Sequence, residues 1–364
     1  MCTACPAIPE TTNAERTEQF EQRFINALND AAMIVMASVG HRCGLFDAMA
    51  GAPALTSDEL AARAGLDERY VREWLGAMVC SGVVEIDPIA RNYRLPAEHA
   101  RLVTRAGDAN LAVFAQYITL SGTVEDDIVE CFRNGGGVPY SRYGRFHEVM
   151  AEDSGQSVLP ALQSAILPLM PDVATRLRDG LRMLDVGCGR GKALLQLAAA
   201  YPKSRFTGYD LSDEAIGWAR AAAERHGLTN LTLEVRDLSD FDATAPARAF
   251  DFITTFDAVH DQARPLNVLK GIRRALAPDG VYLAQDIKGT SDHALDRDNP
   301  IGTLLYTISC MHCMTVSLAQ GGEGLGAMWG RAMAERYFAE AGFGSVEVHE
   351  LAHDIQNYYY VCRP

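Results

Sequence analysis

The stretch that decides the fold is Asp185-Val186-Gly187-Cys188-Gly189-Arg190-Gly191, which follows an apolar strand pattern and runs into a helix pattern over residues 192–200. Glycines at a strand-to-helix turn let the backbone pass close to a ligand, because no Cβ atom stands in the way. Asp210 comes at the end of the next predicted strand, where a carboxylate can accept hydrogen bonds from both hydroxyls of a ribose. This combination predicts a nucleotide-type binding site at the end of a parallel sheet.

Strand and helix patterns alternate outward from this loop. The predicted strands lie at 181–187, 204–210, 231–237, 250–258 and 280–287. Such alternation is typical of a parallel sheet with helices on both faces. Two more strands, 345–351 and 357–362, follow a helix over 333–341, and too few residues separate them for a crossover, so they predict an antiparallel hairpin. We therefore expect an α/β fold: a Rossmann-like, doubly wound, seven-stranded sheet with a terminal antiparallel hairpin.

Three details distinguish the loop from a dinucleotide-binding turn. Its spacing is GxGxG rather than GxGxxG, Asp185 precedes its first glycine, and the third strand ends in Arg236-Asp237-Leu238. As a set, these residues resemble the class I S-adenosylmethionine-dependent methyltransferases. The resemblance implies that the glycine loop faces the methionine part of the cofactor, that Asp210 holds the ribose, and that Asp237 and Leu238 hold the adenine. The predicted binding residues for S-adenosyl-L-methionine are Asp185, Gly187, Gly189, Gly191, Asp210, Leu211, Asp237, Leu238 and Phe256.

The N-terminal part of the chain has the pattern of a mainly helical winged-helix domain. Residues 15–50 have a helical pattern, a capped helix starts at Thr56, and a second helix opens at Asp67 before two short strands at 83–86 and 93–95. A winged helix ahead of the catalytic domain resembles two-domain small-molecule methyltransferases, including the plant O-methyltransferase type and a group of bacterial enzymes. The predicted domains are a disordered tail at 1–14, a winged-helix dimerisation domain at 15–105, a helical, substrate-lining connector at 106–175, and a methyltransferase domain at 176–364.

His260 and Asp261 follow the fourth strand, in the segment 256–261. In the family that the chain resembles, a His-Asp pair at this place carries the catalytic base, although the tryptophan that usually follows is Gln262 here. Methyl transfer to a hydroxyl or thiol needs alignment and a deprotonated acceptor, and a histidine suits the second task. We predict His260 as the base, with Asp261 orienting or screening it, and His312 as the rival base. The alternative is a histidine that is hydrogen-bonded in the core.

Two segments are candidates for the substrate pocket. Residues 140–147 are rich in aromatic side chains and arginine, and residues 306–315 carry sulfur-rich side chains in the insertion before the last helix. Both could equally be packing elements. The predicted substrate residues are Tyr140, Tyr143, Arg145, His147, Met311 and Met314. We predict no metal site, because Cys310 and His312 lie two apart on a helix and do not face one another, and because no second pair follows Cys2 and Cys5 at zinc-site spacing.

Charge and composition narrow the class of protein. The formal net charge is −14, and residues 38–104 hold seven Arg, no Lys and nine Asp or Glu. An acidic surface repels phosphate groups, so we expect neither nucleic acid nor a membrane as partner. No apolar run spans a bilayer and no secretory signal stands at Met1, so we predict a cytoplasmic protein. Residues 15–50 carry more apolar positions than a lone surface helix needs, which favours a homodimer.

The sequence therefore predicts methyl transfer from S-adenosylmethionine to a hydroxyl or thiol of a small molecule. Two other classes of function stay open at this point. One is a winged-helix transcriptional regulator that senses S-adenosylmethionine. The other is a nicotinamide oxidoreductase, which the GxGxG spacing disfavours.

Overall fold

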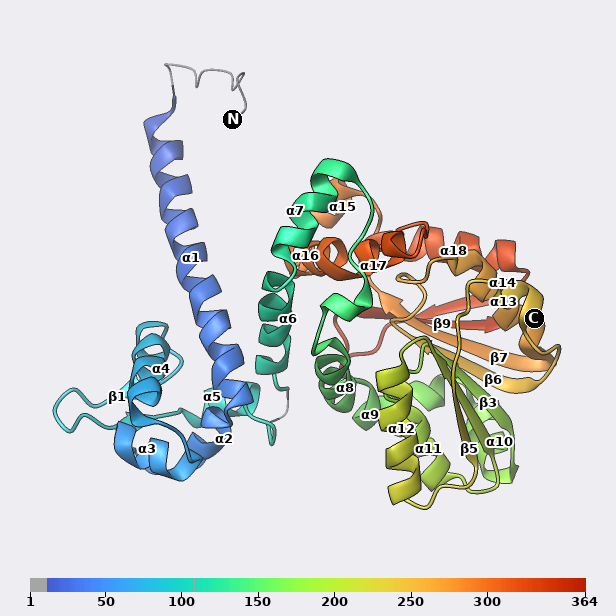
Figure 1. Ribbon diagram of the computed structural model, residues 1–364, viewed down its shortest axis with the longest axis horizontal. Coiled ribbons are helices and arrows are strands. Elements are labelled where there is room, and N and C mark those ends of the chain that lie inside the picture. The colour runs from blue at the N-terminus through green and yellow to red at the C-terminus, as the bar shows by residue number, and fades with distance from the viewer. Residues whose placement is uncertain (1–11, 108) are drawn as a thin grey trace. The chain divides into compact units, whose positions relative to one another are not determined.

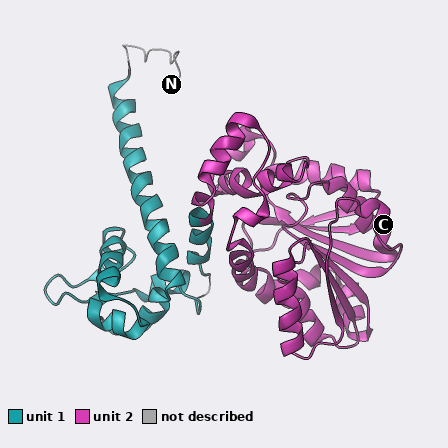
Figure 2. Ribbon diagram, in the orientation of Figure 1, with its two compact units in different colours: residues 1–119 teal, residues 120–364 magenta. Residues whose placement is uncertain are grey.

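The structure, a computed structural model, describes residues 12–107 and 109–364. It forms two compact units, one extending to Thr119 and one from Leu120 onward (Figure 2). Cys2, Cys5 and most of the predicted tail lie outside the described residues. The four-part division of the chain predicted above stays a prediction.

The first unit is mainly helical with a small β-hairpin (Figure 1). Its elements are α1 (Ala14–Arg42), α2 (Leu45–Met49), α3 (Ser57–Ala64), α4 (Glu68–Cys80), β1 (Glu85–Ile86), β2 (Tyr93–Arg94) and α5 (Ala97–Val103), followed by α6 (Ala112–Gly122). Thr56 and Glu59 form a reciprocal capping box on α3, and Asp67 caps α4, as their positions predict. The helix predicted over 15–50 is broken in two, because Gly44 adopts a left-handed backbone.

Trp74 organises the core of the first unit. Its indole Nε1 donates a hydrogen bond to the carbonyl oxygen of Met36 in α1 at 2.9 Å, and its ring packs edge-on against Phe46. A Cβ atom at position 40 would lie 2.6 Å from this ring, so only Gly40 lets α1 cross the tryptophan so closely. Trp74 thus fixes α4, which is the second helix of the winged-helix motif, against α1.

A helical segment leads into the sheet of the second unit. It comprises α7 (Glu125–Asn134), η1 (Tyr140–Arg142), α8 (Phe146–Gln156), α9 (Val158–Ala161), η2 (Leu162–Ile166), η3 (Leu167–Leu169) and α10 (Pro171–Asp179). Gly135 ends α7 with a positive φ, as the run of glycines predicts. A Cβ atom at Gly137 would lie 2.0 Å from the carbonyl oxygen of Thr315, so this glycine allows the chain to pass directly over the helix that contains Thr315.

Seven strands form the sheet of the second unit, in the order β5-β4-β3-β6-β7-β9-β8. They are β3 (Arg182–Val186), β4 (Arg205–Asp210), β5 (Leu231–Val235), β6 (Phe250–Phe256), β7 (Leu276–Ile287), β8 (Ser345–His349) and β9 (Asn357–Arg363). The first five are parallel, and β9 lies antiparallel between β7 and β8. The predicted fold class is confirmed, including the antiparallel pair that closes the sheet.

Helices cover both faces of this sheet (Figure 1). The helical elements after the first strand of this sheet are α11 (Lys192–Ala200), α12 (Asp213–Arg225), α13 (Phe241–Thr244), α14 (Pro265–Ala275), α15 (His293–Asp296), α16 (Gly302–Ile308), the π-helical turn η4 (Ser309–Cys313), α17 (Met314–Ala319), η5 (Ala327–Trp329) and α18 (Gly330–Ala341). Alternate strand residues enter two separate cores, with Leu184 and Ile253 in one and Met183 and Phe252 in the other.

Among the described residues, one straight helical stretch is long and apolar enough to cross a membrane, namely Gly302–Ala319. A bent pair, Phe146–Leu169 with Pro171–Asp179, passes the same test only when it is counted as a single span. Of Gly302–Ala319, 44% is buried within the protein.

Candidate functional site

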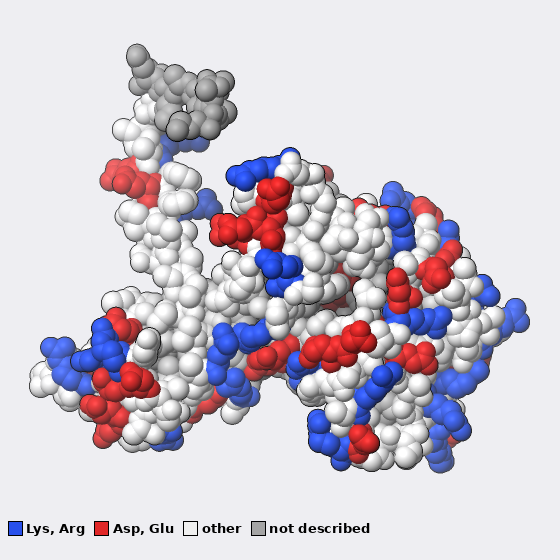
Figure 3. All heavy atoms as spheres, in the orientation of Figure 1, with Lys and Arg blue, Asp and Glu red and all other residues white. Residues whose placement is uncertain are grey.

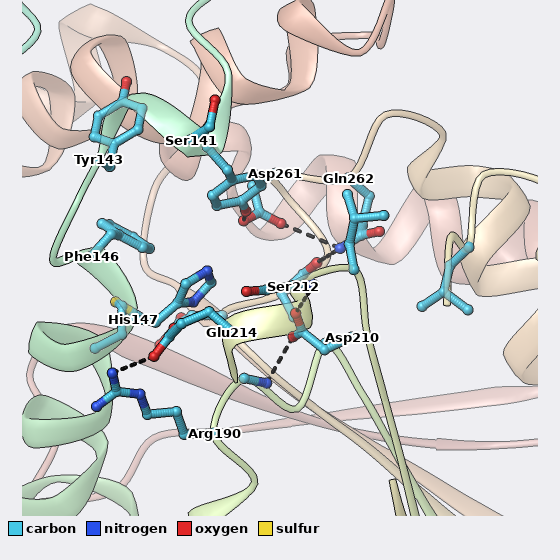
Figure 4. A pocket seen from close by; sticks show the side chains of 18 of the residues that line it. Ser141, Tyr143, Phe146, His147, Arg190, Asp210, Ser212, Glu214, Asp261 and Gln262 are labelled. Atoms are coloured by element: carbon cyan, nitrogen blue, oxygen red, sulfur yellow. Dashed lines mark hydrogen bonds and ion pairs between the residues drawn. The ribbon is translucent and has the colours of Figure 1, made fainter. Parts of the chain in front are cut away.

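A cavity of about 510 Å³ opens at the carboxyl ends of the parallel strands (Figure 4). In the order of the sheet, β4 and β5 lie on one side of β3, whereas β6 and β7 lie on its other side. The cavity therefore lies at the point where the strand order reverses, which is where doubly wound sheets bind ligands. Its volume is within the range of small-molecule sites. Of the predicted residues, the cavity is lined by Tyr140, Tyr143, Arg145, His147, Gly187, Gly189, Asp210, Leu211, Asp237, Leu238, Phe256 and Asp261.

The glycine loop has the conformation that its sequence predicts. Gly187, Gly189 and Gly191 all have positive φ values, of 71°, 52° and 62°. A Cβ atom at Gly187 would lie 2.5 Å from the Cβ of Ala258, so a larger residue cannot fit between the loop and the segment after β6. The loop therefore packs tightly against the segment after β6.

Asp210 connects this loop to the end of β4. Its Oδ2 accepts a hydrogen bond from the backbone N–H of Gly189 at 2.8 Å, and its Oδ1 accepts one from Ser212 N–H at 2.8 Å (Figure 4). A carboxylate offers about four acceptor positions, so it retains lone pairs for a ligand in the cavity. Asp210 thus shapes the loop and also faces the space that the loop encloses.

Asp185 and Gly191 lie deeper than the other predicted binding residues. They border a second, smaller cavity of about 90 Å³, together with Lys192, and do not line the larger one. Asp185 accepts a hydrogen bond from the Thr254 hydroxyl at 2.6 Å, and burial raises the pKa of its carboxyl to about 7, the Thr254 bond opposing this shift.

The third acidic position lies just beyond the carboxyl end of β5, beside the end of β4. Asp237 is exposed and accepts a hydrogen bond from Ser239 N–H, while Leu238 is buried beside it. Arg236 lies over the rings of Tyr209 and Phe241, at 4.7 and 5.2 Å from their centroids. This end therefore combines an acceptor, an apolar wall and a planar cation.

His260 does not line the cavity. The side chain is 4% exposed, and its Nδ1 lies 2.6 Å from Oδ1 of Asp286 at the end of β7. Burial alone would lower the pKa of His260, but Asp286 and the neighbouring Cys313 outweigh it and hold that pKa well above the usual range. The carboxylate that pairs with His260 is thus Asp286, which the sequence analysis missed, rather than the predicted Asp261. Asp286 lies at the end of the predicted strand 280–287, and a carboxylate at that strand end is the sequence signal that could have indicated a partner for His260.

Asp261 lies on the cavity wall instead. Its Oδ2 accepts a hydrogen bond from the hydroxyl of Tyr140, and its Oδ1 is 3.4 Å from the side-chain amide of Gln262. Burial raises the pKa of the Asp261 carboxyl to about 6, although His260 and Tyr140 act in the opposite direction. Figure 4 shows Asp261 and Gln262 on the side of the pocket away from Arg190.

His312 lies behind the aromatic wall of the cavity. Its ring stacks on Phe146, with centroids 3.5 Å apart, and meets Tyr140 and Tyr143 edge-on. The side chain is 4% exposed, and neither ring nitrogen has a hydrogen-bond partner. Burial lowers the pKa of His312 well below its usual range, helped by the nearby His260 and His147, so the ring is neutral.

The predicted substrate residues Met311 and Met314 do not line the cavity. Met311 packs against the cluster around Val316, and its carbonyl oxygen accepts a hydrogen bond from the Tyr143 hydroxyl. Both methionines lie in or directly after the π-helical turn η4, which adds a residue to one helical turn and changes the direction of the side chains that follow it.

The cavity also contains residues that the sequence analysis did not single out. Arg190 and Glu214 form an ion pair at 2.5 Å next to His147 (Figure 4). Asp257 follows β6 with a φ of 50°, which is uncommon outside glycine and recurs at functional sites. The described residues contain no group of three or more His, Cys, Asp or Glu side chains that could hold a metal ion.

Two family models match the chain. Residues 31–105 match the model described as an Rv2258c-like winged HTH domain, and residues 177–340 match the model described as a methyltransferase domain. The glycine loop, Asp210, Asp237 and the His260–Asp261 segment all lie within the second match.

Curated relatives match about a third of this chain. The chain is 33% identical over 129 residues to a ubiquinone biosynthesis O-methyltransferase of Actinobacillus pleuropneumoniae serotype 7, covering 34% of this chain and 54% of that protein. It is 30% identical over 114 residues to a fatty-acid O-methyltransferase of Mycolicibacterium smegmatis, covering 31% and 40%. The chain thus spans about half the length of the curated relatives it matches.

Solved structures resemble the chain over nearly its whole length. Mitomycin 7-O-methyltransferase superposes with a TM-score of 0.69 and 16% identity, covering 97% of this chain and 100% of that one. Human N-acetylserotonin methyltransferase in complex with S-adenosylmethionine superposes with a TM-score of 0.65 and 16% identity, covering 98% and 99%. At these identities, the likeness establishes the fold.

Proposed function

Because the chain belongs to the S-adenosylmethionine-dependent methyltransferases with an N-terminal winged-helix domain, we propose that it transfers a methyl group to a hydroxyl or thiol of a small molecule. One observation carries the proposal: Asp210 hydrogen-bonds the glycine loop and lines a cavity that a second acid, Asp237, also lines. Two acceptors in one cavity beside a glycine loop suit a nucleoside with an amino-acid tail.

S-adenosyl-L-methionine, when bound, supplies a methyl group on a sulfonium that is already a good leaving group. The protein then has to align the acceptor and remove its proton. In this proposal Asp210 accepts hydrogen bonds from the ribose, Asp237 and Leu238 hold the adenine, and the loop from Gly187 to Gly191 faces the methionine part. The excess of carboxylates around the cavity favours a cationic donor.

The acceptor would occupy the part of the cavity formed by Tyr140, Tyr143, Phe146 and His147. Aromatic walls of this kind hold an apolar or aromatic body and leave one polar group to be oriented. The names of the curated relatives favour oxygen over sulfur as the acceptor atom. The proton of that acceptor has two candidate destinations, His260, as the sequence predicts, and Asp261.

Calorimetric titration with S-adenosylhomocysteine and with NAD tests the cofactor, because only the first should bind. A panel of phenols, aliphatic alcohols and thiols, followed by release of S-adenosylhomocysteine, tests the reaction.

The regulator alternative requires binding to DNA. In α4, Arg69 and Arg72 pair with Glu73 and Glu68, so we expect no retention on double-stranded DNA even at low salt. Retention without turnover of any acceptor would contradict the proposal.

A further inference from the structure

We propose that Asp261, held by Tyr140, takes the proton from the methyl acceptor, and that His260 acts behind it as a positioning residue. The inference rests on the proposed methyl transfer and assigns its proton-accepting group to a carboxylate.

His260 is poorly placed to receive a proton. Its side chain is almost completely buried and does not line the cavity. Its Nδ1 lies 2.6 Å from Oδ1 of Asp286, and Cys313 is a second neighbour that favours the charged ring. Asp286 is itself fixed, since its Oδ1 also accepts hydrogen bonds from Trp329 Nε1 at 3.0 Å and from Ile287 N–H at 2.9 Å. These contacts stabilise an imidazolium, which has no free lone pair for an acceptor proton.

Asp261 meets the requirements that His260 does not. Its carboxylate lines the cavity on the same side as Tyr140 and Gln262. The Tyr140 hydroxyl occupies Oδ2, which leaves Oδ1 with only a long contact to Gln262. A general base must come within hydrogen-bond reach of the proton it removes, and Oδ1 of Asp261 satisfies this condition from the cavity wall.

The proposed step conserves atoms and charge. The O–H or S–H bond of the acceptor breaks and its proton goes to Oδ1 of Asp261. The electron pair left on the acceptor forms the new bond to the methyl carbon, while the carbon–sulfur bond of the donor breaks and its pair returns to sulfur. Asp261 releases the proton to water after the product leaves.

The charges around Asp261 suit this task. Burial raises the pKa of its carboxyl to about 6, the positive His260 and the Tyr140 hydrogen bond lower it, and Asp210 and Asp286 raise it further. The carboxyl is therefore ionised at neutral pH yet more basic than an exposed aspartate. Burial and the charge of Asp261 raise the pKa of Tyr140 well above its usual range, so Tyr140 remains a hydrogen-bond donor.

Histidine ring ¹⁵N NMR on the full-length protein with S-adenosylhomocysteine tests the inference without any acceptor. His260 should keep both ring nitrogens protonated in the neutral pH range, above the ordinary histidine pKa of about 6.5. The signal is identified by its loss in His260→Gln, and exposed His226→Gln is the matched control. If His260→Gln does not fold, the signal is identified by its response to Asp261→Asn. A neutral His260 ring in this range would overturn the inference.

Single-turnover rates against pH, with an acceptor from the panel above, give the second test. Asp261→Asn should slow methyl transfer by about 10²- to 10⁴-fold and leave affinity for S-adenosylhomocysteine within about threefold. His260→Gln should cost less and move the acidic limb of the profile to higher pH, because the cation that lowers the pKa of Asp261 is gone. Tyr140→Phe should move the limb in the same direction. Exposed Asp298→Asn is the control.

The two proposals fail in different ways. If no S-adenosylhomocysteine binds, the proposed function is wrong. If it binds and acceptors react, but Asp261→Asn keeps its rate while His260→Gln loses all dependence on pH, the function stands and the assignment to Asp261 is wrong.

Discussion

Asp210→Ala removes a carboxylate that we propose binds the ribose of the cofactor and that also accepts hydrogen bonds from the backbone of the protein. In the structure its two oxygens each accept a backbone hydrogen bond of 2.8 Å, from Gly189 and from Ser212. A hydrogen bond to a charged group contributes about 1.5–3 kcal/mol, and the side chain is only half-buried. We therefore expect the free energy of unfolding to fall by about 1–3 kcal/mol through the loss of these two bonds.

The effect on the cofactor is separate and can be measured separately. Loss of one hydrogen bond between the carboxylate and the ribose should weaken binding of S-adenosylhomocysteine about 10- to 150-fold. Methylthioadenosine has the same ribose but no amino-acid tail, so its affinity should fall by the same factor if Asp210 acts on the ribose alone. A larger loss for S-adenosylhomocysteine would show that the glycine loop has also moved.

Isothermal titration calorimetry with both ligands gives these ratios, and urea denaturation gives the stability. Asp213→Asn is the matched control, because Asp213 is an exposed carboxylate in the first turn of α12. An unchanged dissociation constant in Asp210→Ala, or an equal loss in the control, would refute the reasoning.

Three further predictions concern assembly, the buried histidine and the glycine loop. The exposed side chains of Phe20, Phe24 and Leu28 form a stripe along α1, whose middle part carries few charged side chains in Figure 3, so light scattering should give about twice 39.6 kDa, and Phe24→Glu with Leu28→Glu should give monomers. A mass near 40 kDa for the unmodified chain at micromolar concentration would exclude the dimer. His312→Phe keeps the stack on Phe146 and removes two buried ring nitrogens that have no hydrogen-bond partner, so the free energy of unfolding should stay constant or rise by about 1–2 kcal/mol. A fall of that size in urea denaturation would mean that water molecules hydrogen-bond to these nitrogens. Gly187→Ala should lower the melting temperature more than Gly227→Ala, because both have positive φ but only position 187 would also place a Cβ atom 2.5 Å from Ala258; equal losses would show that the contact relaxes freely.

The sheet and its loop could be predicted because their signals are local. Strand periodicity, the glycines from 187 to 191 and the acids at the strand ends each depend on a few neighbouring residues. The partner of His260 could not be found in this way. Asp286 is close to it only because β6 and β7 lie side by side, and the neighbouring Asp261 was the more obvious candidate.

The side chains of the insertion show a second limit. The sulfur-rich side chains of residues 306–315 predict Met311 and Met314 as substrate residues, with packing as the equal alternative. The π-helical turn at Ser309–Cys313 changes the direction of these side chains, and no residue type in this segment predicts such a turn. Gly44 is a comparable case, since a single glycine inside an apolar pattern does not by itself show that the helix ends there.

The position of β9 has a consequence for the order in which the protein can fold. This strand supplies the hydrogen-bonding partner of both β7 and β8, yet residues 288–356 separate it from the end of β7. While the chain is being synthesised, β7 has an unpaired edge until Asn357–Arg363 leave the ribosome, and nearly all its side chains are of the kind that become buried. A chain that is truncated or cleaved before Asn357 therefore presents an apolar strand edge, and we expect such a chain to aggregate even though its glycine loop is intact.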